Sequence, residues 1–419
     1  MKGLLFERNL PRFAAARVVS AIAGSGRGSA VGPLRLVDMP SPELPGPGWY
    51  HVRPILAGIC GSDLATLDGR ASRYFEDFVS FPFVPGHEVV GLVEGGDAAL
   101  PSGTRVVLEP VLGCIARDIH PPCNACAEGH TGNCERVAFG HLAPGLQIGY
   151  CADTGGGWSK GGLVAHASQL HRVPDSLDDD SAVMVEPTAC AVHAALRALE
   201  PWESTGASQN SGEASPPMVA VVGSGTLGLT TIAALRHFGG QVVVLAGAKY
   251  SHQKEMAIAL GADVAVSPGE LAREVRRRSR SLVASGHSTS GADVVVDCVG
   301  TGESISESLA MVRPRGRVVL VGMPSKVDID LASLWHREVG LVGAYAYGTE
   351  QLSGRTRSTF DLAIELAGAA GIGRLVSAHY PLERFEEAVA HAGAAGRRGA
   401  AKIVFDLRAP IVKGPTNEP

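Results

Sequence analysis

The sequence predicts an α/β fold with two parts, a barrel-like antiparallel β domain and a doubly wound parallel sheet. The chain has 419 residues, which is too long for a single compact core. Residues 1–190 are rich in glycine and proline and contain short apolar runs between turn clusters, a pattern that favours antiparallel strands. Over 191–343, apolar strands alternate with helical stretches, as in a parallel sheet covered by helices. Residues 344–419 return to the first pattern, so we expect them to complete the first domain.

The first domain is expected to begin with a strand, Gly3–Phe6, followed by a short insertion. Its other early strands should lie in four apolar runs separated by glycine- and proline-rich turns, namely RLVDMP, WYHVRPILAG, HEVVGLVE and TRVVLEP. The end of the chain adds a helix over 383–392 and a closing strand, Lys402–Leu407.

The parallel sheet is organised around Met218–Phe238. This stretch begins with small and β-branched apolar residues, typical of a buried parallel strand, and continues as a helix from Leu227. Between them lies Gly-Ser-Gly-Thr-Leu-Gly, and this strand, turn and helix context makes the G-x-G-x-x-G pattern a dinucleotide-binding fingerprint. Gly223 permits the tight turn, Gly225 lets the backbone approach a pyrophosphate, and Gly228 lets the helix lie close to the strand.

After the fingerprint, apolar strands continue to alternate with helices, including a helix over 252–260. We expect the strands in QVVVLA, DVAV, ADVVVDCVG, RVVLVGM and GLVGAYAY. Two stretches, Glu203–Pro217 and Arg273–Gly291, are predicted to be loop insertions. The basic run Arg276–Arg278 is interpreted as a solvated helix end.

Composition argues against several classes of protein. The net charge is −5, which gives no reason to expect a nucleic acid or an anionic membrane as partner. No apolar run reaches the length of a membrane span, and the N-terminus lacks the unbroken apolar core of a secretory signal. We therefore expect a soluble, cytoplasmic protein that acts on a small molecule.

Three short segments ahead of the parallel sheet carry side chains that bind metals. They contain Cys60, then His87 with Glu88, and then Glu186. A thiolate, an imidazole and carboxylates from separate positions form the donor set of a catalytic zinc, with one place open for substrate. Each residue alone is more often a packed or surface side chain, but together and in this order they indicate zinc.

In these motifs and their order, the chain resembles the zinc-dependent medium-chain alcohol dehydrogenases over nearly its whole length. The shared motifs are Cys-Gly-Ser-Asp, Gly-His-Glu, a group of four cysteines, a Glu-Pro pair and the glycine fingerprint. Because of Glu186-Pro187 the chain is more similar to the polyol and threonine dehydrogenase branch, where a glutamate stands in place of a cysteine ligand. The resemblance implies a GroES-like catalytic domain, 1–190 plus 344–419, and a Rossmann nucleotide-binding domain, 191–343.

The resemblance also implies roles for the metal-binding residues. Cys60 and His87 would bind the catalytic zinc, and Glu88 and Glu186 are both candidates for the remaining position. Asp63 would orient His87 and fix its tautomer. Zinc would lower the pKa of a bound substrate hydroxyl, and the nicotinamide would accept the hydride.

Proton release is the point at which the chain departs from the family. By the resemblance, Ser62 would take the substrate proton; a second interpretation is that its hydroxyl bonds a nearby turn. Family members usually carry a histidine five residues after the cysteine ligand as the outer end of a proton relay, but here Ala65 stands there. The proton must then leave through water, the cofactor ribose or another residue. The intact Cys60, Ser62 and His87 argue against the alternative of a non-catalytic nucleotide-binding protein of the same fold.

Four of the eight cysteines form a second group, spaced Cys114-x8-Cys123-x2-Cys126-x7-Cys134. In a chain without an export signal, a metal site is a better interpretation than disulfides. By the resemblance, this lobe (110–136) holds a structural zinc on four cysteines spaced x2, x2 and x7, so we expect an insertion within Ile115–Pro122. His120 sits at the unexpanded spacing and competes with Cys114, which we favour because four thiolates form a common closed site. A metal-free lobe is the remaining alternative. Buried thiols are expected at Cys151, Cys190 and Cys298.

For the cofactor we expect NADP, with NAD as the alternative. NAD-binding folds place an acid about 20 residues past the fingerprint, at the end of the second strand. Here Leu245–Tyr250 contains no acid, and Lys249 could meet a 2′-phosphate with help from His252 or Lys254. The residues expected to contact the cofactor are Gly223, Gly225, Thr226, Leu227, Gly228, Lys249, Cys298, Val299, Gly300, Val321, Gly322 and Met323.

The substrate class that the sequence indicates is an alcohol, polyol or the corresponding ketone or aldehyde. Aromatic residues concentrate in 66–83, where they would either wall a pocket for a bulky alcohol or pack the barrel; they are Tyr74, Phe75, Phe78, Phe81 and Phe83. The resemblance implies a homodimer or homotetramer.

Overall fold

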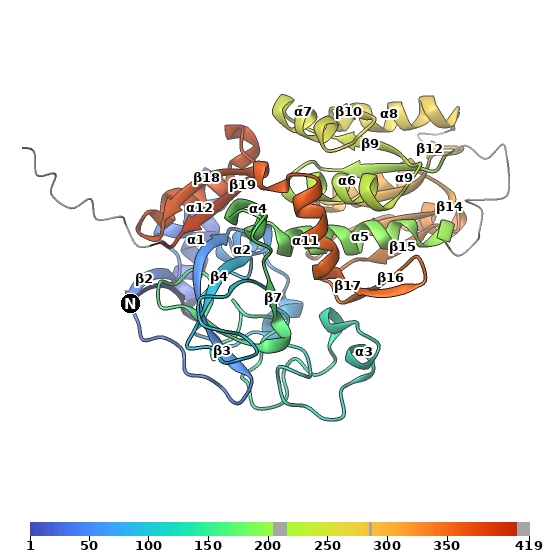
Figure 1. Cartoon of the computed structure of the whole chain (residues 1–419). Coiled ribbons are helices and arrows are strands. Elements are labelled where there is room, and N and C mark those ends of the chain that lie inside the picture. The colour runs from blue at the N-terminus through green and yellow to red at the C-terminus, as the bar shows by residue number, and fades with distance from the viewer. Residues whose placement is uncertain (204–215, 285–286, 409–419) are drawn as a thin grey trace, which may run out of the picture.

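Two large sheets organise the chain, one below the other in the view of Figure 1. The computed structural model describes residues 1–203, 216–284 and 287–408. One sheet has seven strands in mostly antiparallel pairs, and the other has six strands in parallel pairs only. The predicted combination of an antiparallel β domain and a doubly wound sheet is confirmed.

Strands from residues 49–172 and from the end of the described chain form the seven-stranded sheet. Its order is β18-β19-β3-β4-β5-β7, with β6 paired to β3. The closing strand β19 runs antiparallel to β3 and parallel to β18, so the last strand lies inside the sheet. The strands are β3 (Trp49–Gly58), β4 (Val89–Glu94), β5 (Arg105–Leu108), β6 (Leu163–His166), β7 (Leu170–Arg172), β18 (Val376–Pro381) and β19 (Lys402–Asp406).

The parallel sheet has the order β10-β9-β8-β13-β14-β15. The order in which the chain adds strands to this sheet reverses between β8 and β13, so that β9 and β10 lie on one side and β14 and β15 on the other. Doubly wound sheets bind ligands at such a point, beyond the carboxyl ends of the strands. The strands are β8 (Met218–Val222), β9 (Val243–Gly247), β10 (Val264–Val266), β13 (Ala292–Asp297), β14 (Val312–Leu320) and β15 (Gly340–Gly343).

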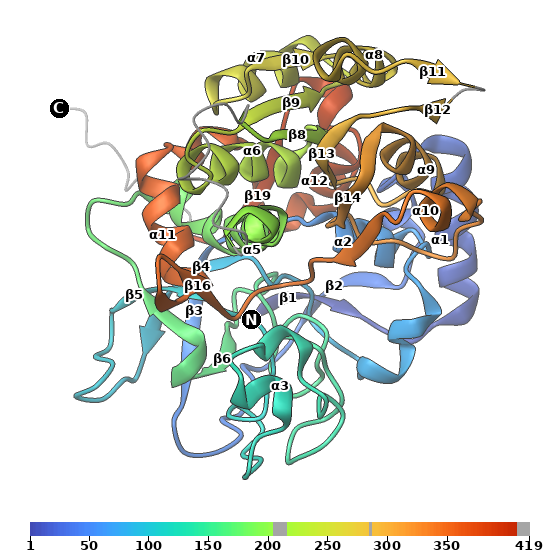
Figure 2. The same cartoon turned by 90° about the vertical axis from the view of Figure 1, so that its right-hand side faces the viewer.

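Helices cover both faces of the parallel sheet because its strands are apolar on both sides. Alternate residues of β8 enter different cores: Val219 and Val221 pack with α5 and α6, whereas Ala220 and Val222 pack with α8 and α9. Figure 2 looks along α5 and shows it between the two sheets. The helices of this part are α5 (Val185–Glu203), α6 (Thr226–Phe238), α7 (Ser251–Ala259), α8 (Pro268–Ser279), α9 (Gly302–Met311) and α10 (Ala332–His336).

The N-terminal insertion forms a helix. Strands β1 (Lys2–Phe6) and β2 (Leu34–Asp38) pair antiparallel, and α1 (Leu10–Ala23) lies between them in sequence. The side chain of Asn9 caps α1 by accepting a hydrogen bond from the N–H of Arg12.

Helix α1 is tied to α2 (Gly61–Leu67), the helix that carries the catalytic motif. Asp68, directly after α2 and 1% exposed, accepts hydrogen bonds from Ser20 Oγ at 2.7 Å and from the N–H of Gly26 at 2.9 Å. Ser25 and Arg70 complete its shell.

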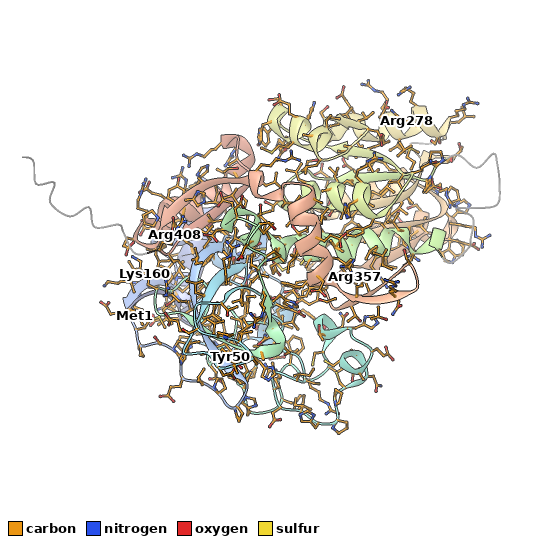
Figure 3. The ribbon with its side chains drawn as sticks, viewed as in Figure 1. Met1, Tyr50, Lys160, Arg278, Arg357 and Arg408 are labelled. Carbon is orange, nitrogen blue, oxygen red and sulfur yellow. The ribbon has the colours of Figure 1, made fainter. Side chains whose placement is uncertain are left out.

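The prediction that Arg273–Gly291 is one loop insertion is wrong in its first half. Helix α8 continues to Ser279, and the short strands β11 (Val283–Ala284) and β12 (His287–Ser288) follow. The helix persists because Glu274 forms ion pairs with Arg277 and Arg278, three and four residues later. Arg278 lies at the outer end of α8 (Figure 3), as expected for a solvated helix end. The other expected insertion, Glu203–Pro217, falls largely outside the described residues.

The remaining elements connect or cover the two sheets. Helix α5 crosses the predicted domain boundary at residue 190, so that boundary stays a prediction. Among the described residues, the helices are too short or too polar to span a membrane. These elements are α3 (Asn124–Ala127), α4 (Asp179–Val183), β16 (Thr349–Leu352), β17 (Arg355–Ser358), α11 (Thr359–Ala369) and α12 (Phe385–Gly393).

Candidate metal and cofactor site

Three predicted metal-binding residues meet where β3 ends and β4 begins. Donor atoms of Cys60, His87 and Glu88 all lie within 4.8 Å of one another. The cause is the antiparallel pairing of β3 with β4, in which the N–H of Gly58 donates to the carbonyl of Glu88 at 2.8 Å. Cys60 is the N-cap of α2, and its N–H donates to Asp63 Oδ2 at 2.9 Å, so the start of this helix is fixed.

Asp63 lies next to the imidazole of His87 but makes no hydrogen bond to its Nδ1. Its Oδ1 lies 3.5 Å from Nδ1 of His87, which leaves the other ring nitrogen for a metal. Tyr150 donates its hydroxyl to the same Oδ1 at 3.2 Å. Burial raises the pKa of Asp63 despite the nearby His87. Burial alone would lower the pKa of His87, but Asp63 and Cys60 outweigh it and hold that pKa well above its usual range.

The two candidate glutamates have different environments. Glu88 forms a buried ion pair with Lys402, the first residue of β19; their side chains are 1% and 3% exposed. Glu186 lies in the first turn of α5 and accepts a hydrogen bond from the Tyr347 hydroxyl at 3.1 Å. Burial raises the pKa of Glu186 to about 7.

The donor set fits a divalent cation such as zinc. Asp63, Glu88 and Glu186 are all less than a tenth exposed, and burying several carboxylates is unfavourable unless cations neutralise them. Lys402 neutralises one of them. A thiol, an imidazole and a carboxylate within one small sphere are the ligands that zinc prefers.

Ser62 and Ala65 both lie on α2. Ser62, two residues after Cys60, is half-buried, and its carbonyl accepts a hydrogen bond from the Thr66 hydroxyl at 3.0 Å. Thr66 and Tyr150 hydroxyls are 3.5 Å apart. Ala65 is buried, so α2 presents no titratable group at the position of the missing histidine.

The glycine fingerprint forms the turn between β8 and α6. A Cβ at Gly228 would collide with the carbonyl oxygen of Gly223, so this close approach requires glycine. A Cβ at Gly225 would have no protein atom within 4 Å, which leaves open space directly over the start of α6. Thr226 begins α6, and its hydroxyl donates to the carbonyl of Ala401 at 2.9 Å, linking this helix to the residue before β19. Leu227 follows it in the first turn.

A second loop lies beside this turn at the end of β13. Buried Asp297 holds it by accepting hydrogen bonds from the N–H groups of Val299 and Gly300 at 2.8 and 3.0 Å. Gly300 packs against the backbone of Gly322. The side chains of Val299 and Met323 are 44% and 37% exposed.

Two of the other predicted cofactor residues take part in this loop through their backbones. The N–H of Val321 donates to the carbonyl of Asp297 at 2.9 Å, which joins the ends of β13 and β14. The thiol of Cys298 points inward, 3.9 Å from the hydroxyl of Thr231 on α6, so only its backbone is available to a ligand on this side.

Lys249 lies just beyond β9, exposed, with its Nζ 5.9 Å from the centre of the Tyr250 ring. The Tyr250 ring stacks on His252 at 5.8 Å. Among the described residues, Nε2 of His252 is buried without a hydrogen-bond partner. This corner therefore offers donors and positive charge and, before Glu255, no carboxylate.

The cysteine lobe brings the sulfur atoms of Cys114, Cys123, Cys126 and Cys134 within 4.8 Å of one another. His120 lies apart, 71% exposed and 3.3 Å from Asp118. The inserted residues are held by buried Arg117, whose guanidinium donates to the carbonyls of Leu112, Phe139, Leu142, Ala143 and Gly145.

The aromatic residues of 66–83 divide between core and surface. Phe83 is 2% exposed and stacks on Phe6 at 5.1 Å, whereas Tyr74 is 72% exposed. The packing interpretation therefore holds for Phe83.

Sequence reasoning missed three side chains of the site, namely Lys402, Tyr150 and Tyr347. Each comes from a segment distant in sequence from Cys60 and belongs to no motif. A lysine at the head of an otherwise apolar strand is the one available signal, because a charge there needs a buried partner.

Comparison with known proteins gives two family matches. Residues 46–175 match the family described as alcohol dehydrogenase GroES-like domain, and residues 226–367 match the family described as zinc-binding dehydrogenase.

Relatives match along most of the chain. The L-idonate 5-dehydrogenase of Vitis vinifera is 30% identical over 379 residues, covering 87% of this chain and 90% of the relative. The sorbitol dehydrogenase of Arabidopsis thaliana is 29% identical, covering 86% and 89%. The structure of galactitol-1-phosphate dehydrogenase from Escherichia coli superposes with a TM-score of 0.67 over 97% of this chain and all of that one, at 18% identity, so it supports the fold alone. The non-catalytic alternative finds no support in these comparisons.

Proposed function

Because the chain belongs to the zinc-dependent medium-chain alcohol dehydrogenase family, whose members oxidise alcohols or reduce the corresponding carbonyl compounds with zinc and a nicotinamide cofactor, we propose a secondary alcohol of the polyol class as its substrate. The relatives named for L-idonate and sorbitol support this class. The observation that carries the catalytic proposal is the cluster of Cys60, His87 and Glu88 at the β3–β4 junction. We retain 1–190 plus 344–419 as the catalytic domain and 191–343 as the nucleotide-binding domain.

We propose Cys60 and His87 as zinc ligands, with Glu88 and Glu186 as candidates for the remaining position. Zinc, when bound, lowers the pKa of a hydroxyl and stabilises the alkoxide. Asp63 is proposed to orient the imidazole, because its Oδ1 lies beside Nδ1 of His87 at 3.5 Å. Glu88 lies in the cluster with Cys60 and His87 but is also paired with Lys402, so we propose that both glutamates take part and exchange with water at the remaining position.

Ser62 is proposed to accept the substrate proton, since it lies in the first turn of α2 beside Cys60. With Ala65 in place of the relay histidine, we propose that the hydroxyls of Thr66 and Tyr150, which lie 3.5 Å apart, carry the proton away from the site. The nicotinamide is proposed to lie against the loops at Cys298–Gly300 and Val321–Met323. Those loops carry backbone groups at the carboxyl ends of β13 and β14.

The test of the catalytic site is the zinc content of purified protein, wild type against Cys60→Ala. We expect two zinc ions per wild-type chain and one in the variant, with alcohol oxidation abolished. Glu186→Gln and Glu88→Gln then separate the two candidate ligands by which one lowers zinc retention against a chelator. One zinc per chain, unchanged by Cys60→Ala, would refute the catalytic site.

A structural zinc on Cys114, Cys123, Cys126 and Cys134 is proposed from the proximity of their four sulfur atoms. Four thiolate ligands also persist best in a reducing compartment, which supports the cytoplasm as the location. Cys114→Ser should release this zinc, whereas His120→Ser should leave it bound.

For the cofactor we propose NADP. The exposed charge of Lys249 supports recognition of a 2′-phosphate beyond β9, and the buried Nε2 of His252, which has no partner among the described residues, is a second candidate contact. Lys249→Ala should weaken NADP binding about tenfold and leave NAD binding nearly unchanged, because one charge-assisted hydrogen bond is lost. Equal effects on both cofactors would refute this assignment.

We propose that the chain forms homodimers through the edge of its parallel sheet. β15 ends the sheet order, and its sequence Gly-Leu-Val-Gly carries no charge that would protect an open edge. Leu341 on this strand is 38% exposed, and Trp335 on α10 just before it is 80% exposed. A second copy pairing with β15 would cover both side chains, and two such dimers would make a tetramer.

A further inference from the structure

Helix α1 is apolar on the side that faces solvent. Leu10, Val18 and Ile22 are 72%, 58% and 83% exposed. With Ala14 they follow the four-residue spacing that places side chains along one line of a helix. We call this surface, together with the exposed Ala15 and Ala21, the outer face of α1.

Among the described residues, nothing packs on this outer face to explain it. The opposite side of α1 carries Ala16 and Ser20, which are buried against the rest of the domain. A surface helix normally pairs one buried apolar face with a polar face toward water. Figure 2 shows α1 at the margin of the molecule, so its outer face is open.

The charged residues of α1, and the nearest exposed ones before and after it in sequence, are all arginines. At 3.6 residues per turn, the exposed Arg17 falls beside the outer face, next to Leu10 and Ala21. Arg12 falls toward the buried side instead, and its Nη1 donates to the carbonyl of Gly32 at 3.3 Å. Arg8 precedes the helix and Arg27 follows it, and α1 itself contains no acidic residue. The nearest carboxylate in sequence, Glu7, is paired with Arg35 at 3.1 Å.

The aliphatic face and its flanking arginines together favour one kind of partner surface over the others that could cover α1. A second copy docked on the same face by two-fold symmetry would bring the arginines of the two chains together, which is unfavourable. A protein partner is recognised through aromatic anchors and directional hydrogen bonds, but the outer face offers only aliphatic groups. An anionic lipid surface accepts aliphatic side chains without directional contacts and attracts the flanking guanidinium groups.

We propose that α1 is an interfacial helix that attaches the enzyme peripherally to anionic lipid bilayers. Leu10, Val18 and Ile22 enter the boundary between headgroups and acyl chains, and Arg8 and Arg17 reach the lipid phosphates beside them. The net charge of −5 describes the whole chain and does not reveal this surface, because α1 itself carries only basic charged residues. The expectation from composition that membranes are no partner is thereby revised for this one face.

Lipid binding by α1 would also hold the catalytic domain at the membrane, because α1 is bonded to that domain. Ser20 of α1 donates to Asp68, the residue that ends α2, so the helix cannot bind lipid independently of the domain that carries Cys60. The proposal does not depend on the substrate or the cofactor.

The test is co-sedimentation of the purified full chain with sucrose-loaded vesicles. One set contains phosphatidylcholine alone, and the other contains equal parts phosphatidylcholine and phosphatidylglycerol. We expect binding to the anionic vesicles that weakens at high salt, and at least about tenfold weaker binding for Val18→Asp combined with Ile22→Asp. Replacing Arg8 and Arg17 by glutamine keeps the outer face and should weaken binding about fivefold per arginine.

A matched control is Ile258→Asp on α7, which is 50% exposed and lies far from α1 in both Figure 1 and Figure 2. This variant should bind vesicles like the wild type, and circular dichroism with thermal melting verifies that every variant is folded. No sedimentation of wild type with anionic vesicles would overturn the proposal, as would an equal loss in Ile258→Asp. A concentration-dependent dimer that disappears in the α1 variant would also overturn it, since a second copy would then cover the face.

Discussion

Replacing Gly225 by alanine tests whether the glycine turn holds the cofactor's pyrophosphate. Alanine fits the backbone here, where φ is −78° and ψ is −169°, and its Cβ would have no protein atom within 4 Å. As Gly225 is the N-cap of α6, we expect at most about 1 kcal/mol of lost stability. A pyrophosphate at the N–H groups of α6 would instead meet the new methyl group.

The expected loss of affinity follows from the hydrogen bonds at this helix start. Each N–H bond to a phosphate oxygen contributes about 1.5–3 kcal/mol, so displacing one raises the dissociation constant roughly 10- to 150-fold. Fluorescence titration with NADPH and NADH measures this change, and thermal melting measures stability.

Two other glycines serve as controls. Gly269, in the first turn of α8, also has open space around its missing Cβ, so Gly269→Ala should leave cofactor affinity unchanged. Gly228→Ala should lose both stability and affinity, because its Cβ collides with the carbonyl of Gly223. If Gly225→Ala binds both cofactors as tightly as wild type, the pyrophosphate is not at this turn.

Three further predictions concern stability and assembly. Burial pushes the pKa of Asp68 upward, but hydrogen bonds from Ser20, Ser25 and Gly26 and from Arg70 outweigh it, so the pKa is lowered. The ionised carboxylate therefore stabilises the fold above about pH 4, its unfolded pKa, and this contribution is lost as pH falls through the folded pKa. Asp68→Asn should lower the free energy of unfolding by about 2 kcal/mol at pH 7, and urea titrations should show the difference shrinking toward pH 3. Lys402→Met should cost about 3–5 kcal/mol, since Glu88 keeps a buried unpaired charge, and adding Glu88→Gln should restore most of it; a double variant no more stable than Lys402→Met would contradict the pairing. Leu341→Lys should shift the sedimentation coefficient from dimer to monomer, and an unchanged assembly would place the subunit contact elsewhere.

The sequence predicts those parts of the fold whose position in the structure restricts which residues can occur there. The strand of β8 and the glycine turn are recognisable because a buried parallel strand must be apolar and a phosphate-binding turn must lack side chains. Cys60, His87 and Glu88 were found from their motifs, and the pairing of β3 with β4 brings them together.

The missed features depend on contacts that no short pattern encodes. Lys402 reaches Glu88 only because β19 inserts beside β3, and Tyr347 reaches Glu186 from the far end of the parallel sheet. The continuation of α8 to Ser279 did have a signal in the sequence, namely the spacing of Glu274 from Arg277 and Arg278. The prediction of a loop over this stretch overlooks that spacing. Helix α1, which forms within the insertion before β2, had no such signal, because its outer face is apolar where a surface helix is expected to be polar.

The position of β19 has a consequence for how the enzyme comes into being. This strand is the last element of the described chain, yet it delivers Lys402 to the metal cluster and, through the carbonyl of Ala401, holds the start of the cofactor helix α6. The residues proposed for zinc binding and proton transfer all precede β19 in the chain, so they leave the ribosome earlier. A chain still in synthesis can therefore hold both halves of the machinery while lacking the strand that joins them, so competence arrives only after β19 has left the ribosome and paired with β3.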